Sequence, residues 1–232
     1  MSSGATGNAR APSELAAIVP AHNEAIRIAS TVAALRAIPE VAEVIVIDDG
    51  STDATAAEAV RAGARVVRLG RNEGKGSAMQ RGIGSTRAPF LLFADADLEG
   101  SASNLRAIIV PVLQGEADVA IAAPPRSDGP SGFGLVERLA GWGIARLTGR
   151  RMERPLSGQR ALRREAARAG FAHGFGVETA FTIDALRAGY RVVEVPCEIS
   201  HARTGRDVAG FTHRARQGVD VARAVADRWR RR

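Results

Sequence analysis

Short apolar runs, each followed by polar residues and then by a stretch with helical spacing, most constrain what this chain can fold into. The runs lie at residues 15–19, 44–47, 64–69, 90–93 and 118–122, and helical patterns separate them at 25–37, 51–62, 76–86 and 105–113. Strands that are apolar throughout and alternate with helices are typical of a parallel sheet covered on both faces. We therefore predict an α/β fold in which helices flank a Rossmann-like, mostly parallel central sheet.

The second half of the chain is less regular. Its pattern predicts helices at 135–147 and 177–188, strands at 156–162 and 191–199, and a C-terminal amphipathic helix at 211–229. Residues 1–13 are small and polar, which predicts a flexible N-terminal arm. We expect one domain over 14–207, long enough to form a single hydrophobic core, followed by a basic amphipathic helix over 208–232.

Positive charge is concentrated at the C-terminal end. The 232 residues include 32 Lys and Arg and 25 Asp and Glu, a net charge of +7, and residues 201–232 alone hold nine arginines and three aspartates. Such a segment favours a local anionic partner or a solvated helix over a general nucleic-acid surface. We expect no nucleic-acid partner; peripheral membrane contact through this helix and packing in a homodimer stay open.

The sequence contains no apolar run of about 18 residues and no apolar segment near its start, so we expect neither a membrane span nor a secretory leader. The single cysteine, Cys197, cannot form an internal disulfide. These features predict a cytoplasmic protein, with the inner face of the membrane as the place of any peripheral contact.

Polar clusters follow three of the predicted strands, at residues 22–24, 48–49 and 95–97. The carboxyl ends of parallel strands meet at one edge of a sheet, where ligands bind. Asp95 and Asp97 repel each other unless a cation lies nearby, and their oxygens suit Mg²⁺ or Mn²⁺. We favour a metal site that stabilises a diphosphate leaving group over a merely polar strand end.

Lys75 is the only lysine among the 32 basic residues. Its neighbours in the Asn-Glu-Gly-Lys-Gly segment at 72–76 let an anion approach the backbone, and a compact ammonium fits there better than a guanidinium. The alternative is that the single lysine occurs here by chance and has no special role. The chain has neither a G-x-G-x-x-G fingerprint after its first strand nor a P-loop, which argues against those two nucleotide-binding classes.

Four segments, in this order and spacing, resemble the motifs of family 2 nucleotide-sugar glycosyltransferases with the GT-A fold. They are IVPAHNE at 18–24, VIDDGSTD at 46–53, NEGKG at 72–76 and DADL at 95–98. The resemblance implies a GT-A domain that binds the donor through Pro20, Ala21, Glu24, Asp49, Lys75 and Asp95. Nucleoside contacts would come from the first three and from Asp49, contacts with the sugar or phosphates from Lys75, and metal ligation from Asp95 and Asp97.

Two later segments, PLSGQRA at 155–161 and GFGVE at 174–178, resemble polyprenyl-phosphate sugar synthases and glucosyl-3-phosphoglycerate synthases. The latter place a metal-binding histidine after the last strand, and His201 occupies the matching position; a surface histidine is the alternative. Glu178 joins Asp97 as a catalytic candidate, as a base, a sugar-hydroxyl acceptor or a structural carboxylate. Arg203 and Arg206 would bind the donor diphosphate or an anionic acceptor, with solvated loop charge as the alternative.

These observations predict a metal-dependent hexosyltransferase that moves one sugar from a UDP- or GDP-linked donor to a small anionic or polyprenyl-phosphate acceptor. A glucosyl-3-phosphoglycerate synthase-like enzyme is an alternative, although the loop at 127–136 does not match the phosphoglycerate-binding segment of those enzymes. A nucleotidyltransferase would need a Gly-rich signature that is absent. A noncatalytic basic module that binds nucleic acid or an anionic membrane is the alternative from another class.

Overall fold

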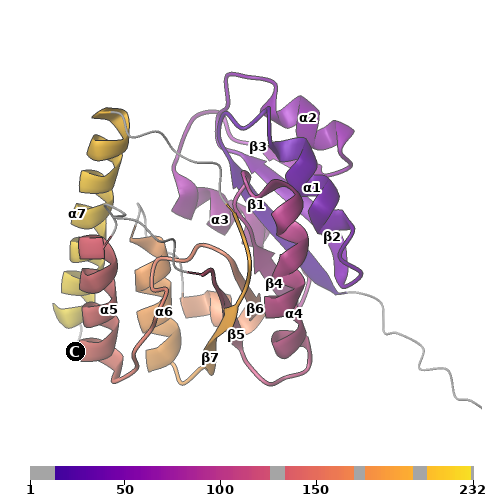
Figure 1. Ribbon diagram of the computed structural model, residues 1–232. Helices are drawn as coiled ribbons and strands as arrows, with labels where there is room; N and C mark the ends of the chain where they lie inside the picture. The colour runs from indigo at the N-terminus through magenta and orange to yellow at the C-terminus, as the bar shows by residue number, and fades with distance from the viewer. Residues whose placement is uncertain (1–13, 126–133, 170–175, 201–207, 231–232) are drawn as a thin grey trace, which may run out of the picture.

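The structure, a computed structural model, describes residues 14–125, 134–169, 176–200 and 208–230. In this part of the chain a seven-stranded sheet forms the centre of the molecule, in the order β3-β2-β1-β4-β6-β5-β7 (Figure 1). The strands are β1 (Leu15–Ala21), β2 (Val41–Asp48), β3 (Arg65–Arg68), β4 (Phe90–Phe93), β5 (Val119–Ala123), β6 (Arg160–Arg163) and β7 (Val192–Pro196). All neighbouring strands are parallel except that β6 runs antiparallel to β4 and β5, so the predicted mostly parallel sheet is confirmed.

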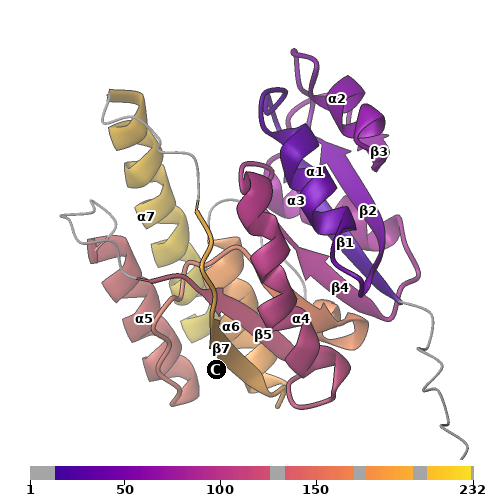
Figure 2. The ribbon, with the colours of Figure 1, turned by 45° about the vertical axis from the view of Figure 1, so that its right-hand side comes forward.

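Helices cover both faces of the sheet. They are α1 (Ile28–Arg36), α2 (Thr55–Arg61), α3 (Lys75–Gly84), α4 (Arg106–Leu113), α5 (Gly134–Thr148), α6 (Val177–Arg187) and α7 (Val208–Arg230). Alternate side chains of β1 enter opposite layers, because successive residues of a strand point to opposite faces. One layer packs under α1 and α4 and the other under α3 and α6, which buries the central strands on both sides (Figure 2).

The two remaining long helices form an outer layer. α5 and α7 pack against each other and against α6 rather than against the sheet, through a small apolar cluster that includes Ile144, Ile183 and Val225 (Figure 1). Within the described residues, no helix combines the length and the apolar composition needed to cross a bilayer. The predicted C-terminal helix is present as α7. The expected N-terminal arm at 1–13 lies outside the described residues.

Two elements differ from the sequence-based prediction in ways that matter for the site. The first helix begins at Ile28 instead of residue 25, because the Asp53 carboxylate accepts the backbone N–H of Ala25 and holds that segment as a turn. β6 begins at Arg160 instead of residue 156 and pairs this residue with Phe93 at the end of β4. Since β6 is antiparallel, the segment that leads into it reaches the same edge of the sheet at which the parallel strands end.

Candidate active site

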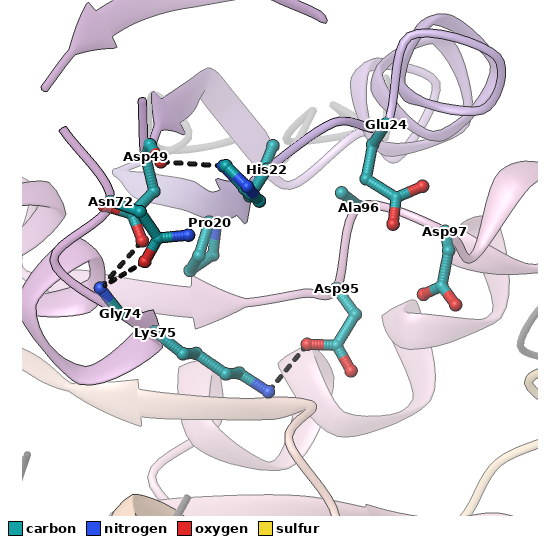
Figure 3. Close-up of a pocket in the computed structure, with 11 residues that line it drawn as sticks. Pro20, His22, Glu24, Asp49, Asn72, Gly74, Lys75, Asp95, Ala96 and Asp97 are labelled. Carbon is teal, nitrogen blue, oxygen red and sulfur yellow. Dashed lines mark hydrogen bonds and ion pairs between the residues drawn. The ribbon is translucent and has the colours of Figure 1, made fainter. Parts of the chain in front are cut away.

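A cavity of about 580 Å³ opens at the edge of the sheet where β1, β2 and β4 end (Figure 3). β4 pairs with β1 only as far as Ile18, so the sheet parts beside Pro20, whose missing N–H costs no ladder hydrogen bond to β4. The cavity is lined by Pro20, Ala21, His22, Glu24, Asp49, Asn72, Gly74, Lys75, Asp95, Ala96 and Asp97. Every residue of the first half for which we expected a binding or metal role is in this set, and all four motifs contribute to it.

Hydrogen bonds join the loop after β1 to the loop after β2. Asn23 has the left-handed φ of 56°, donates its backbone N–H to Ser51 Oγ at 3.0 Å and accepts the backbone N–H of Thr52 at its side-chain oxygen at 2.9 Å. His22 Nδ1 lies 2.9 Å from the backbone oxygen of Asp49. These contacts fix the two motif loops as one wall of the cavity.

Asp49 holds the main chain that precedes α3. Its two carboxylate oxygens accept the backbone N–H groups of Glu73 at 2.7 Å and Gly74 at 2.8 Å, and the residue is only 4% exposed. Gly50 makes the close approach possible, because a Cβ there would lie 2.5 Å from the backbone of Arg71. No residue pattern predicted this contact, which connects the second motif to the third and sets the start of the helix that carries Lys75.

Lys75 is the cation of the cavity wall. Its Nζ lies 2.8 Å from Asp95 Oδ1 and 3.0 Å from Glu178 Oε1, so the ammonium joins α3 to the end of β4 and to the start of α6 (Figure 3 shows the Asp95 contact). Burial acts to lower the pKa of Lys75, but the carboxylates of Asp95 and Glu178 overcome this effect and hold the pKa above its ordinary value. Lys75 is therefore charged across the physiological pH range, and Glu178 belongs to the same ionic cluster although it does not line the cavity.

The segment that leads into β6 completes this cluster. Gln159 donates from Nε2 to Asp95 Oδ2 at 2.5 Å, while a Cβ built on Gly158 would lie only 2.6 Å from Lys75 Nζ. The ammonium of Lys75 thus lies directly against the backbone of Gly158, which has no side chain. The sequence marks these residues only through the later motif at 155–161, and it assigned no role to either of them.

Arg160 is a fully buried cation behind the cluster. Its guanidinium donates to the backbone oxygens of Ser157 and Glu178 and lies 5.3 Å from the ring centroid of Phe181. Burial lowers the pKa of Arg160 to about 10, and the carboxylates of Glu178 and Asp95 oppose the shift, so the group stays charged at neutral pH. A buried charge needs such compensation, and the Arg160 guanidinium balances one of the two carboxylates that Lys75 joins.

Asp97 and Glu24 form the acidic side of the cavity (Figure 3). Burial raises the pKa of Glu24; the hydrogen bond from Arg27 opposes this, and the neighbouring Asp97 carboxylate adds to it. A divalent cation beside Asp97 would relieve this repulsion, and the carboxylate oxygens of Asp95 and Asp97 are of the kind that binds Mg²⁺ or Mn²⁺. Among the described residues, no three His, Cys, Asp or Glu side chains form a complete metal site.

The predicted third ligand, His201, lies outside the described residues, as do Arg203 and Arg206. Their expected roles as metal ligand and anion-binding residues therefore stay predictions. The same holds for the individual role expected of each residue that lines the cavity.

The family model described as glycosyl transferase family 2 matches residues 16–171, a segment that contains the whole cavity wall. The chain belongs to glycosyl transferase family 2. This membership confirms the resemblance of the four motifs, and the match extends through β6 and thus includes the antiparallel strand.

Similar family 2 proteins include enzymes of both kinds expected from the sequence. The chain is 33% identical over 204 residues to the glucosyl-3-phosphoglycerate synthase of Mycobacterium tuberculosis (76% of this chain, 62% of that protein). It is 31% identical over 147 residues to the dodecaprenyl-phosphate galacturonate synthase of Rhizobium johnstonii (59% of this chain, 44% of that protein). The chain thus spans less than two thirds of the length of either relative.

A solved structure extends the similarity to three dimensions. The crystal structure of the Mycobacterium tuberculosis glucosyl-3-phosphoglycerate synthase with Mn²⁺, UDP-glucose and phosphoglyceric acid superposes with a TM-score of 0.76 at 27% identity. The match covers 91% of this chain and 79% of that chain. The fold of this family 2 member is therefore that of a protein crystallised with a metal, a nucleotide sugar and an anionic acceptor.

Proposed function

We propose that this family 2 protein transfers a single sugar from a nucleoside-diphosphate sugar to an acceptor that carries a phosphate group. The observation that carries the proposal is the convergence of all four motifs on one cavity of about 580 Å³ with an acidic side and a single lysine. A diphosphate with a bound divalent cation has the complementary charges. The likeness to a structure that contains Mn²⁺ and UDP-glucose supports the same assignment.

The donor site uses the wall made by the first two motif loops. Pro20, Ala21 and Glu24 contact the nucleoside at the end of β1, and Asp49 reaches the base or ribose with lone pairs beyond those that hold the main chain before α3. Asp95 and Asp97, with His201 as a third ligand, would hold Mg²⁺ or Mn²⁺, which would supply positive charge for a leaving diphosphate. A site of this type works by positioning and electrostatics.

Lys75 supplies a fixed positive charge for the diphosphate, and Arg203 or Arg206 supplies a second one. Glu178 is ion-paired with Lys75 at 3.0 Å and is buried, which supports a role in holding the ammonium in place over that of a general base. A phosphate oxygen that acts as the nucleophile, as in a polyprenyl phosphate, is already ionised and needs no strong base, whereas a hydroxyl nucleophile, as in phosphoglyceric acid, has to give up its proton. Asp97 is the catalytic candidate that remains in direct reach of the donor.

Two acceptor classes fit the relatives. Phosphoglyceric acid is present in the similar crystal structure, and a polyprenyl phosphate is named in the similar galacturonate synthase. Both molecules carry a phosphate group, so we propose an acceptor with a phosphate group. The experiment below distinguishes phosphoglycerate from a polyprenyl phosphate. The transferase unit is proposed to extend over 14–207, followed by a C-terminal segment, 208–232, whose helix α7 packs on α5 and α6. Cytoplasmic location and homodimer formation are proposed on the sequence alone.

The test is a two-step assay on the full chain. Thermal shift with UDP and GDP, each with and without Mn²⁺, identifies the base, because a ligand that binds the native state raises the melting temperature. Labelled UDP- and GDP-sugars are then offered with 3-phosphoglycerate or with a polyprenyl phosphate. Metal-dependent stabilisation by one nucleotide and transfer to one acceptor support the proposal. Release of pyrophosphate from a sugar phosphate and a nucleoside triphosphate, with no transfer, would instead show a nucleotidyltransferase.

A further inference from the structure

The outer layer of the molecule presents two stacked tryptophans to solvent. Trp142 of α5 and Trp229 of α7 lie with their ring centroids 6.2 Å apart and their planes at 10°, and Arg146 lies over the Trp229 ring at 4.9 Å. The two tryptophan residues are 56% and 39% exposed, and Leu135 and Val219 on the same pair of helices are 78% and 49% exposed. Four large apolar side chains are therefore exposed along two adjacent helices.

The exposed positions of α5 form one stripe. Leu135, Arg138, Trp142 and Arg146 are the exposed residues of this helix, and their spacing of three to four places them on one side of it. On one flank of the stripe, α7 packs against Gly143 through Val225. The stripe thus alternates apolar and cationic side chains. We call the exposed side of α5 and α7, with the loop at 149–155, the Trp–Arg face.

A groove runs along the other flank of the stripe. Its volume is about 630 Å³, and it lies between α5 and the loop at 149–155. Arg138 and Trp142 line one wall, and Arg151 and Met152 line the other. The groove is separate from the cavity at the sheet edge, because the two share no lining residue.

The segments that form the Trp–Arg face are basic, although two of their arginines, Arg154 and Arg228, are mostly buried and ion-paired. Residues 134–155 and 218–230 hold eight arginines and four acidic residues, a net charge of +4 in a chain of net charge +7, and two more arginines follow in the sequence. Arg138, Arg150 and Arg151 are exposed and make no ion pair with any residue that the structure describes. The acidic Glu137 is engaged by Arg154 at 3.4 Å. The face therefore has cations available for an anionic partner.

We propose that the Trp–Arg face docks this protein on an anionic lipid surface. Tryptophan is enriched at the boundary between lipid and water, because its ring is apolar and its N–H is polar, and arginines near it attract anionic headgroups. A second copy that used the same face would place like charges opposite each other, since a two-fold interface pairs identical surfaces. A nucleic acid would stack its bases on exposed aromatic rings. The Trp229 ring already stacks on Trp142 and lies under Arg146, so it offers little surface to a base, which argues against a nucleic-acid partner.

The chain offers a direct readout, because Trp142 and Trp229 are its only tryptophans. The experiment uses the full chain with vesicles of phosphatidylcholine alone or with about 30 mol % phosphatidylglycerol, at about 0.1 M salt. We expect cosedimentation with the anionic vesicles only, together with a shift of the tryptophan emission to shorter wavelength. The double variant Trp142→Ala/Trp229→Ala should lose the cosedimentation while its melting temperature stays near that of the parent.

Charge variants provide the matched comparison. The triple change Arg138→Gln, Arg150→Gln and Arg151→Gln is expected to weaken partition by about a hundredfold, at about fivefold for each charge near the surface. A control triple, R61Q, R65Q and R87Q, removes equal charge around α2, β3 and the loop after α3, away from α5 and α7 in both views (Figures 1 and 2), and should change partition by less than about fivefold.

Three outcomes would overturn the proposal. The first is an unchanged emission spectrum with no cosedimentation on anionic vesicles, and the second is an equal loss in the control triple. The third is a dimer in light scattering that the double tryptophan variant abolishes, which would assign the face to a second copy. The proposal is independent of sugar transfer, because nucleotide binding measured by thermal shift in the Trp–Arg variants reports on the donor cavity alone.

Discussion

Replacing Lys75 by arginine tests whether the cavity requires a compact ammonium or only a positive charge. The Lys75 Nζ is 2.8 Å from Asp95, and a Cβ on Gly158 would lie 2.6 Å from it, so the backbone of Gly158 closes the space beyond the ammonium. A planar guanidinium is wider and carries its donors in a fixed fork. Lys75→Arg should therefore keep the charge but displace it from the diphosphate.

The magnitude follows from the contact that is lost. A hydrogen bond to a charged group contributes about 1.5–3 kcal/mol, which corresponds to an about 10- to 150-fold change in dissociation constant. We expect Lys75→Met and Lys75→Arg both to weaken UDP binding in the presence of Mn²⁺ by this factor. The side chains of Lys75 and Asp95 are 30% and 26% exposed, so losing that ion pair alone should cost the fold at most about 1 kcal/mol. Lys75→Met also leaves the buried Glu178 carboxylate without its ammonium, which adds to this cost.

Isothermal titration of UDP with saturating Mn²⁺ measures the effect, and thermal melting confirms that the variants are folded. Arg81→Met is the matched control, since it removes a cation from the same helix at a position that does not line the cavity. Gly158→Ala, with Lys75 intact, should weaken binding in the same direction by pushing the ammonium aside. If Lys75→Arg bound UDP within about twofold of the parent, a difference below 0.5 kcal/mol, the steric argument would fail and charge alone would suffice.

Three other changes probe the metal site, the pH dependence and the packing. Asp97→Asn should abolish most of the Mn²⁺-dependent rise in melting temperature that UDP produces, because an amide is a poorer ligand for a hard cation; a full rise would refute the ligand role. Hydrogen bonds from Arg191 lower the pKa of Asp118 below its ordinary value of 3.8, so its carboxylate stabilises the fold above that value and loses this effect as the pH falls through the lowered pKa. Asp118→Asn should thus be less stable by up to about 1 kcal/mol at neutral pH and equal to the parent in acid, as measured by urea unfolding; a gap that persists in acid would contradict this. Gly82→Ala would place a Cβ 2.3 Å from a methyl carbon of β1 and should destabilise the fold by about 1–3 kcal/mol, whereas Gly84→Ala, with nothing within 4 Å, should not; equal effects would refute the packing argument.

The first half of the fold could be predicted because its signals are local. Apolar runs located β1, β2, β4 and β5 to within three residues, since a buried parallel strand needs apolar side chains on both faces. The same rule placed Glu24, Asp49 and Asp97 at one edge, because the carboxyl ends of parallel strands coincide. The cavity therefore followed from strand order and polar strand ends.

The second half could not be predicted to the same depth because its decisive contacts are distant in sequence. Gln159 contacts Asp95 across 64 positions, and the hydrophobic pattern reports the burial of a strand and not its direction. A strand was predicted at 156–162, but the burial of Arg160 at the start of β6 was not, since an arginine is rarely buried unless it is paired. The main-chain contacts of Asp49 escaped prediction for a related reason, because backbone N–H groups leave no trace in residue identity.

The reversal of β6 limits how acceptor preference can diversify on this scaffold. Among the described residues, the second half of the chain meets the Lys75–Asp95 ion pair at Gly158 and Gln159 before β6 and at Glu178 of α6. Because none of the described residues that line the cavity belongs to α5 or α7, substitutions on the exposed side of these helices can change the proposed lipid docking without altering the cavity. A transplanted second half would have to bring its own glycine, glutamine and arginine in the same register, or the lysine would lose the surface against which it rests.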